Sequence, residues 1–310
     1  MKTILPHFRV ALAAFALTSA IPLTSSHAGG LGGEASRFQI FSIGDLQVSN
    51  SSPNGAVATG GDFVASGTSI GSGLDPQRDS VIVAAGDVTL SNGTYQNGNI
   101  VVGGTPNIAA SAGLTNARVV QLQTSIDFQD AQDEYSRLSQ RLAGIEATGE
   151  TFVYSWRAIE LRGLQDGLNV FNITESQYEQ SNGIAVPDFD PNVHTVVINV
   201  AGDNVLRGSN GSLFVGQVNS QTNYQSLADR NDFSRHQRLL WNFHQATSLV
   251  SNGSIHGAIL APGAHLTHQN GQLVGQVIAG SVDLRNAARI ATTPFLGELA
   301  PPRSSAVGFD

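Results

Sequence analysis

Residues 253–261 read Gly-Ser-Ile-His-Gly-Ala-Ile-Leu-Ala, and residues 271–279 repeat this pattern 18 positions later as Gly-Gln-Leu-Val-Gly-Gln-Val-Ile-Ala. Glycines coincide at 253/271 and 257/275, and apolar residues coincide at four positions: Ile255 with Leu273, Ile259 with Val277, Leu260 with Ile278 and Leu266 with Leu284. A unit this short cannot bury its own apolar side, but stacked copies can. The repeat therefore predicts a solenoid.

The rest of the chain supports short strands separated by tight turns. Residues 83–90 resemble residues 277–284, and Gly-Asp followed by alternating apolar residues recurs at 44, 61 and, less regularly, 202. Asn-Gly, which favours turns with positive φ, occurs at 54, 92, 97, 182, 210, 252 and 270. We predict a mainly β fold, a right-handed parallel β-helix with coils of roughly 18 residues. An antiparallel sandwich with similar strands stays open as an alternative.

One segment, residues 127–145, has helical periodicity. Its apolar residues are spaced by three and four positions: Phe128, Ala131, Tyr135, Leu138, Leu142 and Ile145. Asp127 is placed to cap the first turn. Acidic residues come early and arginines late, which suits the helix dipole. We expect one amphipathic helix that flanks the solenoid and covers it, as packing and not as a partner-binding helix.

The N-terminus has the pattern of a secretory signal peptide. Lys2 and Arg9 precede the apolar run at 10–17, and residues 26–28, Ser-His-Ala, are a small-x-small cleavage site. The apolar run is too short to span a bilayer, which needs roughly 20 residues. We predict a signal peptide at 1–28, cut between Ala28 and Gly29, and no later transmembrane segment.

Composition limits the partners of the exported part. Without Lys2 and Arg9, 14 arginines stand against 24 acidic residues, a net charge near −10. Nucleic acid is an unfavourable partner for such a chain. The absence of cysteine excludes thiol catalysis and Cys metal sites. We expect one β-helix domain at 29–290 and a Pro-containing flexible tail at 291–310, with no recognisable C-terminal anchor.

Several motifs have an apparent chemistry that their context does not support. Ser69 lies in a G-x-S-x-G pattern, but no helix is expected after it, as a nucleophile elbow needs. His265 and His268 are three residues apart, so on a strand they point to opposite faces and do not share a metal. The Gly-Asp aspartates are too sparse for calcium turns, and we expect them to cap turns instead: Asp45, Asp62, Asp87 and Asp203. We predict no catalytic, cofactor or metal residues.

Two further features of the sequence concern ligand binding. Trp241, with Asn242 and Phe243, could form a platform for a sugar, but the apolar neighbours favour a place in the core. A flat ice-binding face would be expected to carry a regular threonine array. Thr89, Thr94 and Thr105 are not in repeat register, so ice binding is disfavoured.

These features together resemble the choice-of-anchor A family of bacterial surface proteins over about residues 36–284. The resemblance lies at 41–46 and 60–63, in the helix at 127–145, at 197–202, and in the block 239–243 that runs into 257–262 and 275–279. It implies an exported adhesive domain with a fold similar to the β-helix and flanking helix of ice-binding proteins. It brings no catalytic motif.

We therefore expect a non-catalytic adhesive or extracellular-matrix protein, secreted or held at the cell surface, with an extracellular protein or polysaccharide as its ligand and no cofactor. A polysaccharide-active β-helix enzyme is the first alternative, because a solenoid can assemble acidic residues from separate coils. An ice-binding protein is the second.

Overall fold

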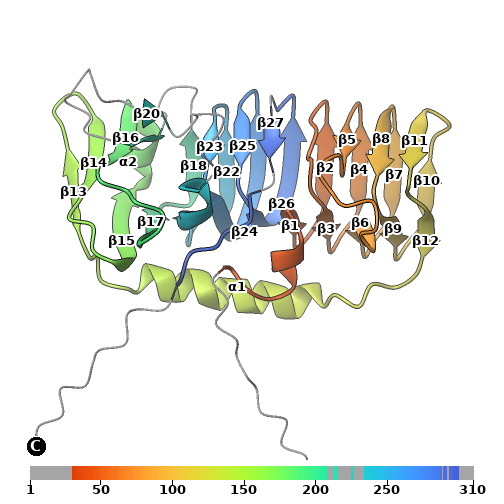
Figure 1. Cartoon of the computed structure of the whole chain (residues 1–310), viewed down its shortest axis with the longest axis horizontal. Coiled ribbons are helices and arrows are strands. Elements are labelled where there is room, and N and C mark those ends of the chain that lie inside the picture. Colours follow the sequence, from red (N-terminus) through yellow and green to blue (C-terminus); the bar gives the residue numbers. More distant parts are fainter. Residues whose placement is uncertain are drawn as a thin grey trace, which may run out of the picture.

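The computed structural model describes residues 30–207, 213–215, 225–226, 234–287, 289–291 and 293–299. Its strands stack side by side into an elongated solenoid-like body, and a single long helix runs along one side (Figure 1). Among the described residues, no helix is long and apolar enough to cross a membrane. The predicted cleavage site at Ala28 and Gly29 lies outside the described residues.

Two sides of the body form one 16-stranded sheet, because β24 and β26 each bend from one side to the next. The helix side consists, in spatial order, of β15 (Gly167–Thr174), β17 (His194–Ala201), β21 (Leu239–Asn242), the first parts of β24 (Ala258–Gln269) and β26 (Val277–Arg285), β1 (Ile40–Ser42), β3 (Val57–Thr59), β6 (Ser80–Ala84), β9 (Asn99–Val102) and β12 (Val119–Gln121). The other side, called the open side here, consists of β18 (Asn204–Arg207), β22 (Ser248–Ser251), the second parts of β24 and β26, β2 (Leu46–Ser49), β4 (Phe63–Ser66), β7 (Val88–Ser91) and β10 (Pro106–Ile108).

The third side is divided among three small sheets. They are β13 (Glu150–Val153), β14 (Ala158–Arg162), β16 (Gly183–Val186), β19 (Leu213–Val215) and β20 (Gln225–Ser226); β23 (Ile255–His256), β25 (Gln272–Val274) and β27 (Arg289–Ala291); and β5 (Ser69–Ile70), β8 (Gly93–Gln96) and β11 (Ala112–Thr115). Pairing is antiparallel only for β13 with β14 and for β19 with β20 among the described strands. The parallel solenoid expected from the repeat is therefore found, and the antiparallel sandwich is wrong.

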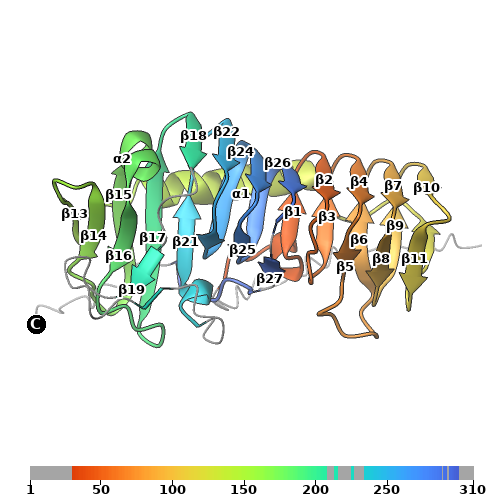
Figure 2. The same cartoon turned by 90° about the horizontal axis from the view of Figure 1, so that it is seen from above.

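The order of strands along the body differs from their order in the sequence. Residues 40–121 build one half, from the middle of the body to one end. Helix α1 (Phe128–Ala143) then runs back along the body, and residues 150–291 build the other half, from the far end to the middle (Figures 1 and 2). There β26 pairs with both β1 and β2. The first strands, β1 and β2, thus meet the late strand β26 in the middle of the length of the body and not at one of its ends.

The 18-residue repeat puts residues from neighbouring strands in direct register. Ile259 pairs with Val277 and Ile255 with Leu273, in each case 18 positions apart. The spacing differs elsewhere: it is 16 positions for Leu266 with Val282, 25 for Val57 with Ile82 and 27 for Val170 with Val197. The longer steps are accommodated by loops on the surface, which cost the fold little.

The predicted alignment of Leu266 with Leu284 is wrong. The register between β24 and β26 shifts at a bulge between Ala261 and His265, so that Leu266 lies beside Val282 and His268 beside Leu284. Residues 262–264, Pro-Gly-Ala, make β24 two residues longer at this bend than β26. A bulge of this kind lets one strand turn a corner that its neighbour turns with fewer residues.

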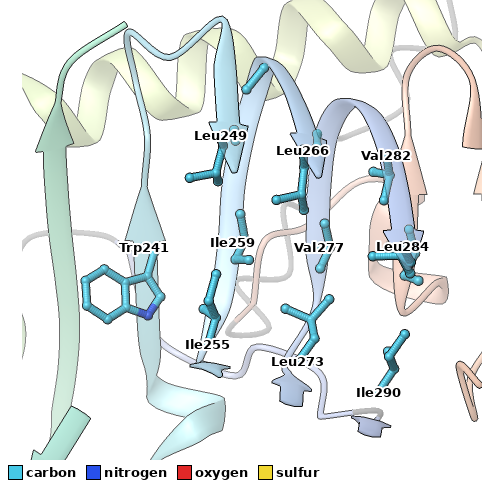
Figure 3. Packing of buried hydrophobic residues seen from close by; sticks show 14 of the residues in the cluster. Trp241, Leu249, Ile255, Ile259, Leu266, Leu273, Val277, Val282, Leu284 and Ile290 are labelled. Atoms are coloured by element: carbon cyan, nitrogen blue, oxygen red, sulfur yellow. The ribbon is translucent and has the colours of Figure 1, made fainter. Parts of the chain in front are cut away.

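The interior is filled by stacked apolar side chains from consecutive strands (Figure 3). Figure 3 shows part of this interior, in which the labelled residues are Trp241, Leu249, Ile255, Ile259, Leu266, Leu273, Val277, Val282, Leu284 and Ile290. Full burial of one such aliphatic side chain contributes about 1.5–3 kcal/mol. Because each rung repeats the same contact, the stack is stable only where neighbouring rungs are present.

In the middle of the helix side, strands β17, β21, β1 and β3 are buried on both faces, because α1 covers their outer face, whereas β12 at the end of the body is not. Asp127 caps α1, its carboxylate accepting backbone N–H bonds from Gln129 and Asp130, each at 3.0 Å. The predicted stripe faces the sheet: Phe128, Ala131, Tyr135, Leu138 and Leu142 are buried, and Ile145 packs at the margin. The helix predicted at 127–145 is thus found, as a cover for the solenoid. The remaining short helices are α2 (Glu175–Gln180) and the 3-10 turns η1 (Glu34–Arg37) and η2 (His236–Arg238).

The segment after β27 is less free than the sequence suggests. Phe295 is buried in the cluster beneath α1, and the backbone N–H of Gly30 donates to the carbonyl of Gly297 at 3.0 Å. The backbone N–H of Leu296 donates to the carbonyl of Gln237 at 2.7 Å. Residues 293–299 therefore pack on the body, although the sequence places them in a flexible tail at 291–310. The end of that tail lies outside the described residues.

Candidate binding surface

The open side is the long face of the body that α1 does not cover; α2 contacts it only at β18, at one end. Its strands alternate strictly, with one residue buried in the interior and the next directed outward, as β2, β4 and β7 show with the same burial pattern. This alternation follows from the period of two in a strand whose inner face is packed and whose outer face is solvated. The outward side chains of the open side are called the open face below.

The central positions of the open face form one rank along the body. Successive pairs in the sheet align, in order, Leu206, Val250, Thr267, Asp283, Gln47, Val64, Thr89 and Asn107. Neighbouring strands are about 4.8 Å apart. Side chains in this rank are therefore displayed at a regular spacing on a rigid support.

The rank is chemically mixed. It contains aliphatic residues, of which Leu206 and Val64 are 50% and 42% exposed, next to amide, hydroxyl and carboxyl groups. The three threonines that do not follow the sequence repeat are also scattered in the structure. Thr89 lies in the rank, Thr105 precedes β10 and Thr94 lies in β8 on the third side. The face therefore has no regular threonine array among its described residues.

Aspartates line one margin of the open face and hold the bend between the two large sides. The carboxylate of Asp45 accepts a backbone N–H bond from Asp62 at 2.8 Å, that of Asp62 accepts from Asp87 at 2.8 Å, and that of Asp87 accepts from Thr105 at 2.7 Å. Each aspartate thus joins its own coil to the next. This geometry supports the turn role expected for Asp45, Asp62 and Asp87, and no group of three or more acidic or histidine ligands that could hold a metal occurs among the described residues.

The glycines before Asp62 and Asp87 leave room for this contact. A Cβ atom at Gly61 would clash with the Asp45 carboxylate, and one at Gly86 would clash with that of Asp62. In each Gly-Asp pair, the aspartate accepts a bond from the next coil, and the glycine makes room for the aspartate of the previous coil. Asp203 differs, because it sits one position earlier in its coil, where its carboxylate accepts the Thr247 hydroxyl bond at 2.6 Å.

Asp283 is the exception within the central rank. It is only 5% exposed, although its neighbours across the sheet, Thr267 and Gln47, are directed outward. The Arg285 guanidinium lies over it, with Nε donating to Oδ2 at 2.8 Å. The Asp283 carboxylate raises the pKa of Arg285 through this hydrogen bond and its charge. The open face thus has one fixed ion pair near its middle.

The late histidines are divided between surface and interior. His265 is exposed, and its Nδ1 is 2.7 Å from the Ser281 hydroxyl, whereas His268 is buried, as their odd spacing predicts. His236 and His256 are also buried, with ring centroids 5.1 Å apart. Burial lowers the pKa of His268 to about 4, and burial with the nearby His236 lowers the pKa of His256 to about 4. His256 and His268 are therefore neutral core residues near pH 7.

Two sequence motifs have structural explanations. Ser69 begins the short strand β5, and no helix follows it, so the G-x-S-x-G pattern is not a nucleophile elbow. Trp241 is 4% exposed, its indole N–H donates to the carbonyl of His256 at 2.9 Å, and its ring meets Tyr178 edge to face at 5.4 Å. It is a core residue, as its apolar neighbours suggested.

A ladder of amides beneath the helix was not predicted. Asn172, Asn199 and Asn242 lie side by side on successive strands. Their side chains are linked, Asn199 donating to Asn172 at 2.9 Å and Asn242 to Asn199 at 2.8 Å, and Ser139 of α1 donates to Asn242 at 2.6 Å. The ladder therefore fixes where α1 rests. Its sequence signal is an Asn that ends each aligned apolar stretch, at 170–172, 197–199 and 240–242.

A cavity of about 340 Å³ lies beside η1. Its lining includes Arg37 and Arg78, together with Phe38, Asp79 and Ser80. The Arg78 guanidinium donates to the backbone carbonyls of Ser80, at 3.0 Å, and of Arg37. Burial and the charge of Arg37 lower the pKa of Arg78. These bonds use Arg78 to tie the loop before β6 to the start of the body.

No curated protein sequence matches the chain. Similar solved structures include an ice-binding protein from an Antarctic biological consortium (13% identity, TM-score 0.39, 87% of this chain and 94% of that chain covered) and the DUF3494 domain of Shewanella frigidimarina ice-binding protein 1 (13%, 0.37, 86% and 98%). A glycosylated ice-binding protein from an Arctic yeast gives 13%, 0.36, 86% and 94%. At these values the similarities do not bear on what this chain binds.

Sequence comparison with protein families gives a clearer result. The family described as "Putative Ice-binding-like adhesive domain" matches residues 31–290, which include the solenoid halves, α1 and the junction between β26 and β1. This span is most of the chain, and the protein therefore belongs to the ice-binding-like adhesive domain family.

Proposed function

We propose that the protein is an exported, non-catalytic adhesive or matrix protein whose open face contacts an extracellular protein or polysaccharide. The observation that carries this proposal is the central rank of the open face, a row of mostly outward side chains supported by buried rungs along most of the body. A polymer or a cell surface presents repeated groups, and a rigid row can meet many of them at once.

Rigidity makes such a surface effective. Association costs free energy when side chains and loops must be ordered on binding. Here the inward residues of each strand, such as Leu46 and Val48 of β2, are buried, so the outward residues between them are already fixed in place. Weak contacts repeated along one target also add by multivalency.

Export and attachment rest on the sequence. The signal-peptide pattern at 1–28 and the absence of cysteine are compatible with a protein outside the cytoplasm. The resemblance to choice-of-anchor A proteins supports a place at the cell surface or in the matrix. We take the solenoid to be right-handed with coils of about 18 residues, the spacing of the best repeat.

Binding of the purified protein to immobilised collagen, fibronectin, chitin, cellulose, the producer's exopolysaccharide and whole producer cells tests this function. We expect saturable binding to at least one surface with no release of soluble sugar. Val64→Arg and Thr89→Arg change the open face and should weaken that binding about tenfold or more. Leu114→Arg, which changes an exposed residue of β11 on the third side, should leave it unchanged.

Other outcomes identify the alternatives. Breakdown of a glycan would indicate a polysaccharide-active enzyme and not an adhesive protein. Thermal hysteresis that is lost in Thr89→Arg would indicate an ice-binding protein. Equal binding by the open-face variants and the wild type would show that the open face is not the contact surface.

A further inference from the structure

An exposed cluster of aromatic residues lies at the far end of the body, away from the open face. It belongs to the hairpin of β13 and β14, in which Phe152 pairs with Glu160 and Glu150 pairs with Arg162. Phe152, Tyr154 and Trp156 alternate along the chain, and the first two share the side of the hairpin that carries Glu160. We call Phe152, Tyr154, Trp156, Glu160 and Arg162 the aromatic hairpin.

The three rings form a continuous row. The centroids of Phe152 and Tyr154 are 4.8 Å apart with an edge-to-face angle of 80°, and those of Tyr154 and Trp156 are 5.5 Å apart at 32°. Trp156 is 45% exposed, and Phe152 and Tyr154 are half-buried. The row thus presents ring surface to solvent.

The exposed aromatic row is not part of the packed core. The other tryptophan of the chain, Trp241, is 4% exposed and packs in the interior, where a large ring contributes most to stability. Trp156 belongs to none of the described core clusters, and only Tyr154 of the row packs on one, against Ala158 and Ala185. An exposed tryptophan next to other rings is typical of a binding surface.

Polar groups hold the row in place. The Tyr154 hydroxyl donates to Glu160 Oε2 at 2.9 Å, and Arg162 donates from Nε to Glu160 Oε1 at 2.8 Å and from Nη2 to the Tyr154 oxygen at 3.0 Å. The Arg162 guanidinium also stacks on Phe152, its Cζ 3.9 Å from the ring centroid. Glu160 is only 5% exposed, and these bonds give each of its carboxylate oxygens a partner. The rings of Phe152 and Tyr154 are therefore held in place, next to Trp156.

We propose that the aromatic hairpin binds a neutral linear glycan. The C–H face of a pyranose ring is apolar and stacks on an aromatic face, while its edge carries hydroxyl groups. Trp156, which is 45% exposed, offers most of the ring surface for this stacking, and the half-buried Tyr154 ring lies next to it with the centroids 5.5 Å apart. Arg162 has five N–H donors and a side chain that is 35% exposed, so it can donate to a sugar hydroxyl at the rim.

The charge of the protein favours a neutral glycan over an acidic one. The exported chain has a net charge near −10, so a polyanion would be repelled over most of its approach. This inference rests on the proposed adhesive function and gives one chemical class for its ligand. It places that contact on the end hairpin, whereas the open face remains the surface for extended targets.

Titration of the full protein with cellohexaose, chitohexaose, maltohexaose, xylohexaose and laminarihexaose tests the proposal, with calorimetry for affinity and tryptophan emission for location. The chain has two tryptophans and Trp241 is buried, so a change in acrylamide quenching reports Trp156. We expect at least one hexasaccharide to bind and to protect Trp156. Trp156→Ala should weaken the affinity tenfold or more. Val153→Ala changes the exposed residue on the other side of the same strand and should leave it unchanged.

The result that overturns the proposal is either no binding of any of the five, or equal affinity of the wild type and Trp156→Ala. Its failure can be told from failure of the adhesive function. If the protein still adheres to cells or matrix without binding a hexasaccharide, adhesion stands and the glycan site falls. If hexasaccharides bind but no surface does, the glycan site stands and the adhesive function falls.

Discussion

Phe41 of the first strand and Ile278 of the last long strand are direct neighbours in the sheet, although 237 positions separate them in the chain. Both are fully buried beneath α1, where the Phe41 ring stacks on Phe128 at 5.1 Å and meets Tyr135 at 6.0 Å. This contact joins the two halves of the solenoid and the helix that connects them. The pairing of β26 with β1 therefore requires the closure of nearly the whole chain, which makes its formation slow.

Loss of this contact should destabilise both halves together. Phe41→Ala removes a buried ring and should lower the free energy of unfolding by about 3–5 kcal/mol. Urea denaturation followed by far-UV circular dichroism and by tryptophan emission should give one coincident transition, shifted to lower urea. Gln47→Ala, at an exposed position of β2, is the control and should change stability by less than ~0.5 kcal/mol. Two separate transitions in Phe41→Ala would show that the halves are stable independently.

The docking of α1 can be tested at a single side chain. Leu138 is 9% exposed and packs on the helix side, so Leu138→Asp loses an apolar contact and buries a carboxylate. We expect a loss of at least ~3 kcal/mol and a clear fall in Tm. Arg137→Ala changes the preceding residue, whose ion pair with Asp133 is exposed, and should cost less than about 1 kcal/mol. An unchanged Tm in Leu138→Asp would mean that the helix is not docked.

The aspartates along the margin of the open face should stabilise the fold through hydrogen bonds, and calcium should not change the stability. Asp62→Ala removes the acceptor for the Asp87 backbone N–H and should cost about 1 kcal/mol, while Asp62→Asn keeps an acceptor oxygen and should cost less. Asp79→Ala, at another exposed acid, is the control. Thermal unfolding measures all three, and the wild-type Tm should be the same in calcium and in EDTA. A calcium-dependent rise of several degrees, lost in Asp62→Ala, would instead identify a calcium site.

The elements that the sequence predicts best are those whose signal is local. The stripe from Phe128 to Leu142 determines a helix, and the pairing of Ile259 with Val277 follows from an 18-residue repeat of apolar residues and glycines. Both depend on neighbours that the pattern itself contains. The solenoid and its flanking helix could therefore be predicted, as could the membership of an adhesive family with an ice-binding-like fold.

What could not be predicted depends on distant contacts. Nothing near Phe41 indicates that its partner is Ile278, and a bulge moved Leu266 from the expected Leu284 to Val282. Among the six Asn-Gly pairs in the described residues, only Asn92, Asn97 and Asn270 adopt positive φ, because the corner of each coil, and not the dipeptide alone, sets the backbone. The aromatic hairpin was missed because Phe152, Tyr154 and Trp156 are unremarkable until exposure shows that they lie outside the core.

The buried histidines predict that acid destabilises the fold. Burial lowers the pKa of His256 and of His268 from 6.5 to about 4, so between these values the unfolded chain takes up protons that the folded protein does not. The free energy of unfolding should therefore fall as pH drops from about 6.5 to about 4, by up to ~3 kcal/mol for each imidazole. Urea denaturation at a series of pH values measures this slope. His268→Leu places an apolar side chain in the same interior position and should remove about half of the dependence, because only His256 remains. His265→Leu, on the exposed side of the same strand, is the control and should follow the wild type. If the free energy of unfolding of His268→Leu depends on pH as steeply as that of the wild type, His268 does not cause the loss of stability in acid, and other groups do.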